Sequence, residues 1–113
     1  MKKGPLAEAL VVQCLQDHFP RLTIRRGKYS GEHDDPGDIE GVPFVTIQVK
    51  NSPSYVSKLA TWVNDSREQM AVACNLLAVV WHKRRGKGDP LDWYVTMTGR
   101  DFLALLAEYT KED

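Results

Sequence analysis

The sequence predicts an α/β fold in which a mixed central sheet is flanked by helices. Three patterns support this prediction: a helical apolar stripe over residues 5–19, strict alternation over residues 44–50 and a continuous apolar run over residues 76–81. A 3.6-residue period indicates a helix, a period of two indicates a half-buried strand, and a short apolar run indicates a strand covered on both sides. With the remaining segments, the predicted order is α, β, β, β, α, β, β, α.

Length and composition are those of an ordinary globular domain. The chain has 113 residues, 15 Lys plus Arg against 15 Asp plus Glu, and 42% hydrophobic residues. We therefore expect residues 1–113 to fold as one domain, and we exclude a disordered or fibrous chain. The longest strongly apolar run, residues 76–81, is far shorter than the ~20 residues of a membrane span, and no signal-peptide pattern is visible. These features predict a soluble cytoplasmic protein with no membrane partner.

The first helix is expected over residues 5–19, directly after Gly4 and Pro5. Its apolar residues recur at three- and four-residue intervals, and they are Leu6, Leu10, Val11, Cys14 and Leu15. At about 100° per residue, Glu8 falls at the border of this stripe, where it can point along the surface on which the helix packs. Short strands are expected over residues 22–26 and 38–42, on either side of a polar loop.

Residues 44–50 alternate as a strand does. Val45, Ile47 and Val49 face one way, whereas Phe44, Thr46, Gln48 and Lys50 face the other. The β-branched side chains predict a face buried against helices. Gln48 and Lys50 then emerge together on the opposite face, at the end of the strand.

A second helical region is expected over residues 55–77, with a break near residues 64–66, where polar side chains can cap a second segment. The apolar side of that second segment consists of Met70, Ala73, Cys74 and Leu77. Cys14 and Cys74 both lie in such apolar patterns without metal-ligand spacing, so two buried free thiols are expected.

The last third of the chain predicts a buried strand, a neighbouring strand and a helix. Residues 76–82 and 92–97 are expected to be neighbouring strands joined by a basic Gly/Pro loop over residues 83–91. Thr98 and Asp101 have the spacing of a capping box, and the apolar residues that follow predict a final helix.

Charge is segregated although its sum is zero. The first basic stretch contains Arg21, Arg25, Arg26 and Lys28, and the second contains Lys83, Arg84, Arg85 and Lys87. Between them lie Glu32, Asp34, Asp35, Asp38 and Glu40. Basic stretches on each side of clustered carboxylates favour a polyanion held near a metal, because phosphate contacts provide most sequence-independent affinity for nucleic acid. Solvated loops with spare charge are the alternative.

Residues 37–51 resemble the active-site hairpin of the PD-(D/E)XK nuclease superfamily. That motif places an Asp on one strand and then, on the next, an acid, one spacer residue and a Lys. Asp38 matches the Asp, Lys50 matches the Lys, and Gln48 stands where Glu or Asp is usual. The resemblance implies a restriction-endonuclease-like αβββαβ core, which agrees with the predicted element order.

Within the superfamily, the chain is most similar to small phage-encoded Holliday junction resolvases. This likeness also rests on Trp62, Gln69 and residues 79–86 and 93–97. It implies a Mg²⁺-dependent (or Mn²⁺-dependent) endodeoxyribonuclease acting in DNA recombination, in the host cytoplasm if the protein is phage-encoded. A four-way junction has two strands to cut symmetrically, so a homodimer is expected.

The resemblance assigns roles to individual residues. It implies that Asp38, Gln48 and Lys50 are catalytic, and that the metal is held by Glu8, Asp38, Gln48 and the backbone carbonyl of Val49. Oxygen ligands suit a hard cation that binds the scissile phosphate and lowers the pKa of an attacking water. The Lys50 ammonium can orient that water and stabilise the charge that develops on phosphorus.

Gln48 departs from the family pattern. An amide in place of a carboxylate removes one negative charge and weakens the attraction for a divalent cation, although some branches of the superfamily carry Gln. His33, Asp34 or Asp35 are candidates for the missing ligand. Two alternatives follow: a non-catalytic DNA-binding or assembly module that retains the fold, or a nuclease acting on single-strand or duplex DNA.

Branched DNA is the expected partner. The candidate DNA-binding residues are Arg25, Arg26, Lys28, Gln69, Lys83, Arg84, Arg85 and Lys87. The loop that carries the last four is the strongest candidate, because basic residues on a Gly-containing loop can follow a phosphate backbone. Trp62, Trp81 and Trp93 are expected in the core, and His82 is expected to have a packing role.

Overall fold

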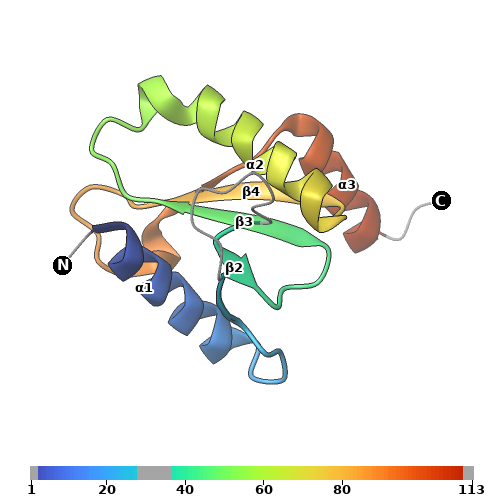
Figure 1. Ribbon diagram of the computed structural model, residues 1–113, viewed down its shortest axis with the longest axis horizontal. Coiled ribbons are helices and arrows are strands. Elements are labelled where there is room, and N and C mark those ends of the chain that lie inside the picture. Colours follow the sequence, from blue (N-terminus) through green and yellow to red (C-terminus); the bar gives the residue numbers. More distant parts are fainter. Residues whose placement is uncertain (1–2, 28–36, 111–113) are drawn as a thin grey trace.

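Helices lie on opposite faces of a three-stranded mixed sheet (Figure 1). The structure, a computed structural model, describes residues 3–27 and 37–110. The strands of this sheet, in spatial order, are β3 (Val45–Lys50), β4 (Leu77–His82) and β5 (Tyr94–Thr96). β3 and β4 are parallel, whereas β5 is antiparallel to β4. The predicted α/β class with a mixed sheet is therefore confirmed.

Helix α1 (Lys3–His18) begins two residues earlier than predicted. Pro5 is accommodated in its first turn, where a backbone N–H would have no partner within the helix. Its buried side consists of Ala7, Val11, Val12 and Leu15. These residues pack against Ile47 and Val49 of β3 and Leu77 and Val79 of β4 in one aliphatic cluster. The predicted inward orientation of the β-branched residues of β3 is confirmed.

Two predicted strands are reduced to a minimal second sheet. β1 (Arg25–Arg26) pairs antiparallel with β2 (Ile39–Glu40). Gly41 then turns the chain with φ +100°, and a Cβ at this position would lie 2.0 Å from the Thr23 carbonyl oxygen. Only glycine fits there. Phe44, at φ 67°, lies in the turn before β3, so that strand begins one residue later than predicted.

Helix α2 (Leu59–Ala73) is continuous, and the predicted break at residues 64–66 is wrong. The Ser66 hydroxyl donates to the Val63 carbonyl at 2.8 Å, so the side chain is satisfied inside the helix and does not cap a new one. The helix ends at Cys74, which adopts a left-handed conformation and is exposed. The prediction of a buried thiol is therefore wrong for Cys74, while Cys14 is half-buried.

The connection from β4 to β5 is braced by tryptophan. A 3-10 turn over Pro90–Asp92 precedes β5, which makes this strand shorter than predicted. The indole N–H groups of Trp81 and Trp93 donate to the carbonyls of Pro90 and Lys87, at 3.1 and 2.8 Å. Trp93 is buried and Trp81 half-buried, as predicted for core aromatics.

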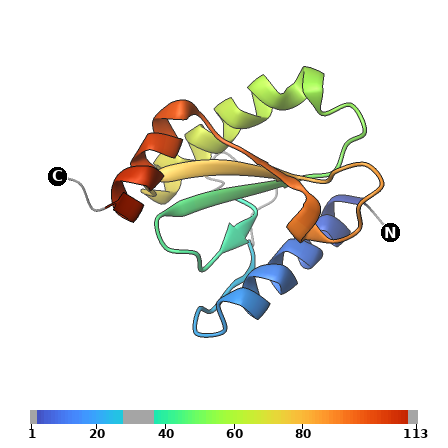
Figure 2. The same cartoon turned by 180° about the vertical axis from the view of Figure 1, so that it is seen from behind.

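Helix α3 (Gly99–Thr110) lies at the end of the sheet opposite the N-terminus of α1 (Figure 2). Thr98 Oγ1 accepts the Asp101 N–H at 3.1 Å, which confirms half of the predicted capping box. The Asp101 carboxylate, in contrast, accepts from Arg67 Nε and from the Ala78 N–H, both at 3.3 Å. Among the described helices, none is both long and apolar enough to cross a membrane.

Candidate active site

Asp38 is held against the outer edge of β3. Its backbone N–H donates to the Ile47 carbonyl at 2.9 Å, and its Oδ2 accepts the Val49 N–H at 2.7 Å. Its own carbonyl accepts the Gly27 N–H at 2.7 Å. The carboxylate thus has a fixed position beside the strand that carries Gln48 and Lys50, as the sequence predicted for the hairpin.

The carbonyl of Val49 faces the same edge of the sheet as Asp38. The N–H and C=O of one residue point to the same side of a strand, and successive residues alternate. The Lys50 carbonyl accepts the Lys83 N–H at 2.9 Å on the β4 side, so Val49 directs its carbonyl to the other side. Two predicted metal ligands, the Asp38 carboxylate and the Val49 carbonyl, therefore share one edge.

Gln48 is buried on the face of β3 that looks toward α2, and 5% of its surface is exposed. Its Oε1 is buried without a hydrogen-bond partner among the described residues. A buried oxygen without a partner is destabilising by about 1–3 kcal/mol, which a bound cation would offset. Amide and carbonyl oxygens are suitable ligands for hard cations, so Asp38, Gln48 and Val49 fit Mg²⁺ or Mn²⁺.

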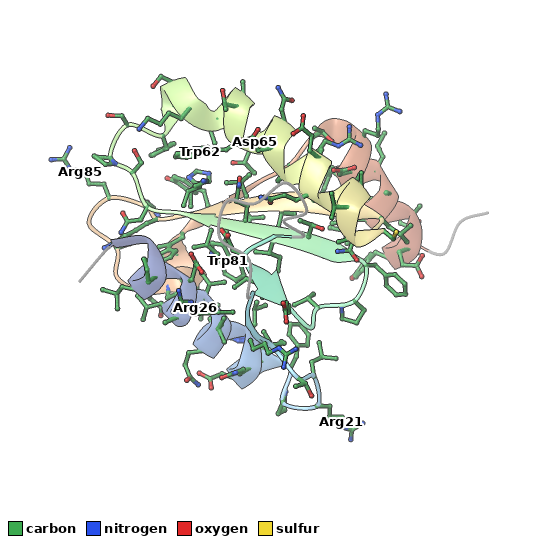
Figure 3. All side chains as sticks on the ribbon, in the orientation of Figure 1. Arg21, Arg26, Trp62, Asp65, Trp81 and Arg85 are labelled. Carbon is green, nitrogen blue, oxygen red and sulfur yellow. The ribbon has the colours of Figure 1, made fainter. Side chains whose placement is uncertain are left out.

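Lys50 lies at the end of β3 and is half-buried. Its Nζ lies 5.9 Å from the centre of the Trp62 ring, and Figure 3 shows Trp62 between α2 and the sheet. Within residues 3–27 and 37–110, no acidic group is close enough to Lys50 for an ion pair. The ammonium therefore lies over the aromatic ring and is not paired with an acidic side chain in this part of the chain.

Glu8 forms an ion pair with Arg26 at 3.3 Å. Arg26 is paired with Ile39, the residue after Asp38, so the structure brings Glu8 to the β1–β2 side of the hairpin. The positive charge of the Arg26 guanidinium compensates the negative charge of Glu8, however. The described part of the chain contains no cluster of three or more His, Cys, Asp or Glu residues suited to a metal.

The two basic stretches have different surroundings. Arg25 forms an ion pair with Glu40 at 2.8 Å and Arg26 with Glu8, so both predicted DNA-binding arginines are compensated. Figure 3 shows Arg21 far from Arg85. The second stretch directly follows β4 and therefore lies at the Lys50 end of the sheet, because β3 and β4 are parallel. Lys28, His33, Asp34 and Asp35 lie outside the described residues.

An aromatic cluster on the α2 side was not predicted from the sequence. His82 packs against Tyr55, Tyr94 and Trp62, with ring centres 4.9, 5.9 and 6.3 Å apart. His82 is buried, and its Nε2 is hydrogen-bonded to Thr96 Oγ1 at 2.8 Å, which confirms its predicted packing role. Burial lowers the pKa of His82. No sequence signal identifies this cluster, because each ring comes from a different segment.

Gln69 lies three and seven residues beyond Ser66 and Trp62, the buried residues of α2. This spacing places it on the side of the helix that faces the sheet, where it is half-buried. The structure therefore places Asp38 beside β3, the strand that carries Gln48, Val49 and Lys50, and leaves Glu8 beside Arg26. Comparisons with protein-family models, curated proteins and solved structures found no match.

Proposed function

We propose that this chain is a Mg²⁺-dependent (or Mn²⁺-dependent) endodeoxyribonuclease of the PD-(D/E)XK type that cleaves branched DNA, with the four-way junction as its substrate. One observation carries this proposal. The Asp38 carboxylate is fixed by the Val49 N–H beside β3. On that strand, the buried Gln48 Oε1 has no partner among the described residues, and Lys50 follows two residues later. Oxygen donors next to an ammonium group are what phosphodiester hydrolysis requires.

Each residue has a distinct part in this chemistry. Asp38, Gln48 and the Val49 carbonyl would hold the cation, with Glu8 joining them if Arg26 moves away. When bound, the cation supplies Lewis acidity at the scissile phosphate. The Val49 N–H keeps the Asp38 carboxylate oriented. Lys50 orients the attacking water and stabilises the negative charge that develops on the phosphate oxygens.

A second candidate is a DNA-binding or assembly module without catalysis. Gln48 is neutral, and Glu8 is compensated by Arg26 at 3.3 Å. Together these features leave little net negative charge to attract a divalent cation. Such a module would bind DNA through the second basic stretch in a salt-sensitive manner. Replacing Asp38 would then preserve or improve affinity by removing a negative charge.

The deciding experiment is a gel assay with labelled four-way junction, matched duplex and single strand in Mg²⁺, Mn²⁺ or EDTA. Wild type is compared with Asp38→Ala and Lys50→Ala, and Arg100→Ala serves as a control that removes an exposed charge on α3. We expect metal-dependent paired nicks near the crossover, retained by the control and reduced at least ~100-fold in the two site variants. Intact DNA in every lane with retained binding would instead establish the non-catalytic module. If single-stranded or duplex DNA were cut as fast as the four-way junction, the junction would not be the preferred substrate.

The exposed apolar side of α3 supports the proposed homodimer. It consists of Phe102, Leu103, Leu105, Leu106 and Tyr109. From their exposed fractions these side chains offer roughly 500 Å² of surface, which is most of the ~800 Å² per partner in a standard interface. Two-fold pairing uses the same patch on both copies. Leu103→Asp with Leu106→Asp should convert a dimer into a monomer in sedimentation equilibrium; an unchanged mass would exclude this interface.

A further inference from the structure

A pocket of about 420 Å³ opens at the Lys50 end of the sheet. Its walls are Leu6 of α1, residues 51–53 and Tyr55 of the connection between β3 and α2, and Lys83, Arg85 and Gly86 after β4. Figure 1 shows the start of α1 and both connections at this one end of the sheet. We call it the end pocket. Its volume is within the range of small-ligand sites and suits one nucleotide.

The end pocket is positively charged. Lys83 and Arg85 line it, and none of its described lining residues is acidic. Across residues 3–27 and 37–110, neither cation forms an ion pair. Arg84, between them, is instead placed over the Tyr94 ring at 5.3 Å. Two cations without an ion pair in this part of the chain, both lining one concave site, favour a phosphate.

The end pocket also has an apolar, aromatic side. Tyr55 lines it and is only half-buried, and its ring is held by contacts with His82 at 4.9 Å and Tyr94 at 6.4 Å. Leu6 and Pro53 add aliphatic surface beside it. A pre-positioned aromatic ring next to cations suits a planar base attached to a phosphate better than inorganic phosphate alone.

The end pocket adjoins the proposed active site. Asn51, in its wall, is the residue after Lys50, and Lys83 donates its N–H to the Lys50 carbonyl at 2.9 Å. A nucleotide in the pocket would therefore lie beside the phosphodiester that Lys50 contacts. A base can enter such a site only after leaving the duplex stack, which requires least energy where it is already unpaired.

We propose that the end pocket binds one unstacked nucleotide of the DNA, with its base on Tyr55 and its phosphate between Lys83 and Arg85, and that this selects branched or single-stranded DNA over duplex. This inference rests on the proposed action on DNA, but it concerns binding and requires no hydrolysis. Binding measured in EDTA therefore tests the nucleotide site separately from the nuclease activity. If the protein does not cleave DNA but still prefers single-stranded DNA through the end pocket, only the proposed nuclease is contradicted.

The test measures dissociation constants by fluorescence anisotropy in EDTA, with labelled single-stranded oligonucleotide and matched duplex. Tyr55→Ala should weaken single-strand binding about tenfold and duplex binding less than about twofold, because base stacking is lost. Tyr55→Phe should bind as wild type does. Lys83→Gln with Arg85→Gln should weaken single-strand binding and make it less dependent on salt. Arg100→Ala, at the far end of the sheet, is the matched control.

Three outcomes would overturn the proposal: unchanged single-strand affinity in Tyr55→Ala, an equal loss for single strand and duplex, or tighter binding of free dAMP than of the oligonucleotide. The last would identify a site for free nucleotides. If circular dichroism shows that Tyr55→Ala is unfolded, Tyr55→Leu provides the same comparison with a side chain that still packs against His82.

Discussion

The two faces of the β3-β4-β5 sheet differ in chemistry although the same strands build both. Toward α1, Ile47 and Val49 join an aliphatic cluster. Toward α2, their neighbour Gln48 buries a polar side chain, and Lys50 lies over the Trp62 ring. Alternation along one strand thus assigns packing to one face and candidate chemistry to the other.

Most buried polar groups on the α2 face have partners. Asn75 Nδ2 donates to Thr46 Oγ1 at 2.8 Å, and Ser66 is bonded within its helix. In the part of the chain that the structure describes, Gln48 Oε1 and His82 Nδ1 lack a partner, and both belong to the C-terminal halves of β3 and β4. These two buried polar atoms without a partner therefore both lie toward the end of the sheet that carries Lys50.

The largest expected effect comes from adjacent residues on opposite faces. Ile47 and Gln48 are equally buried, at 4% and 5% exposure. Ile47→Ala should lower the free energy of unfolding by about 2–4 kcal/mol, because it leaves a cavity in the aliphatic cluster. Gln48→Met should instead raise the free energy of unfolding by about 1–3 kcal/mol, because it removes a buried oxygen that has no hydrogen-bond partner among the described residues. Urea denaturation measures both, and similar losses would show that the faces do not differ in this way.

A slightly smaller effect is expected for Asp101→Ala, which should lower stability without abolishing DNA cleavage. The Asp101 carboxylate joins α3 to Arg67 of α2 and to the Ala78 N–H at the start of β4, away from Lys50. Asp101→Ala should be destabilising by about 2–3 kcal/mol because it leaves a buried N–H and a cation unpaired. DNA cleavage at low temperature should persist. Exposed Asp65→Ala is the control for loss of a carboxylate, and loss of cleavage in folded Asp101→Ala would break the separation.

A carboxylate in place of the Gln48 amide tests whether the α2 face of β3 contributes to metal binding. Gln48→Glu adds a negative charge next to Asp38 and should increase the affinity for Mg²⁺ about tenfold. Isothermal titration without DNA measures this directly. Asp38→Ala combined with Gln48→Glu should lose the gain. No measurable Mg²⁺ binding by either Gln48→Glu or wild type would argue for the non-catalytic module.

The smallest effect concerns pH. Burial lowers the pKa of His82 from 6.5, so below that pH the unfolded chain binds more protons than the folded one at this residue. Stability should therefore fall as pH decreases through and below about 6.5, by at most about 1.4 kcal/mol per pH unit. His82→Gln should make the unfolding free energy less dependent on pH in this window. Parallel wild-type and His82→Gln curves would contradict this assignment.

Local rules account for the parts of the fold that the sequence predicted well. The alternation in β3 and the Thr98 cap of α3 both follow from contacts within a few residues. The same rules failed at residues 64–66, because Ser66 can bond to its own helix as readily as it can cap another. They also failed at Cys74, because the helix ends one residue before it and Cys74, in a left-handed conformation, is exposed.

The sequence by itself determined the element order and the inward face of β3. The tertiary structure alone decided that Arg26 compensates Glu8, that the second basic stretch lies at the Lys50 end, and that Tyr55 meets His82. The reason is the range of the interactions. Backbone geometry and side-chain alternation act over a few residues, whereas ion pairs, ring contacts and pockets join segments that only the packing of helices on the sheet brings together.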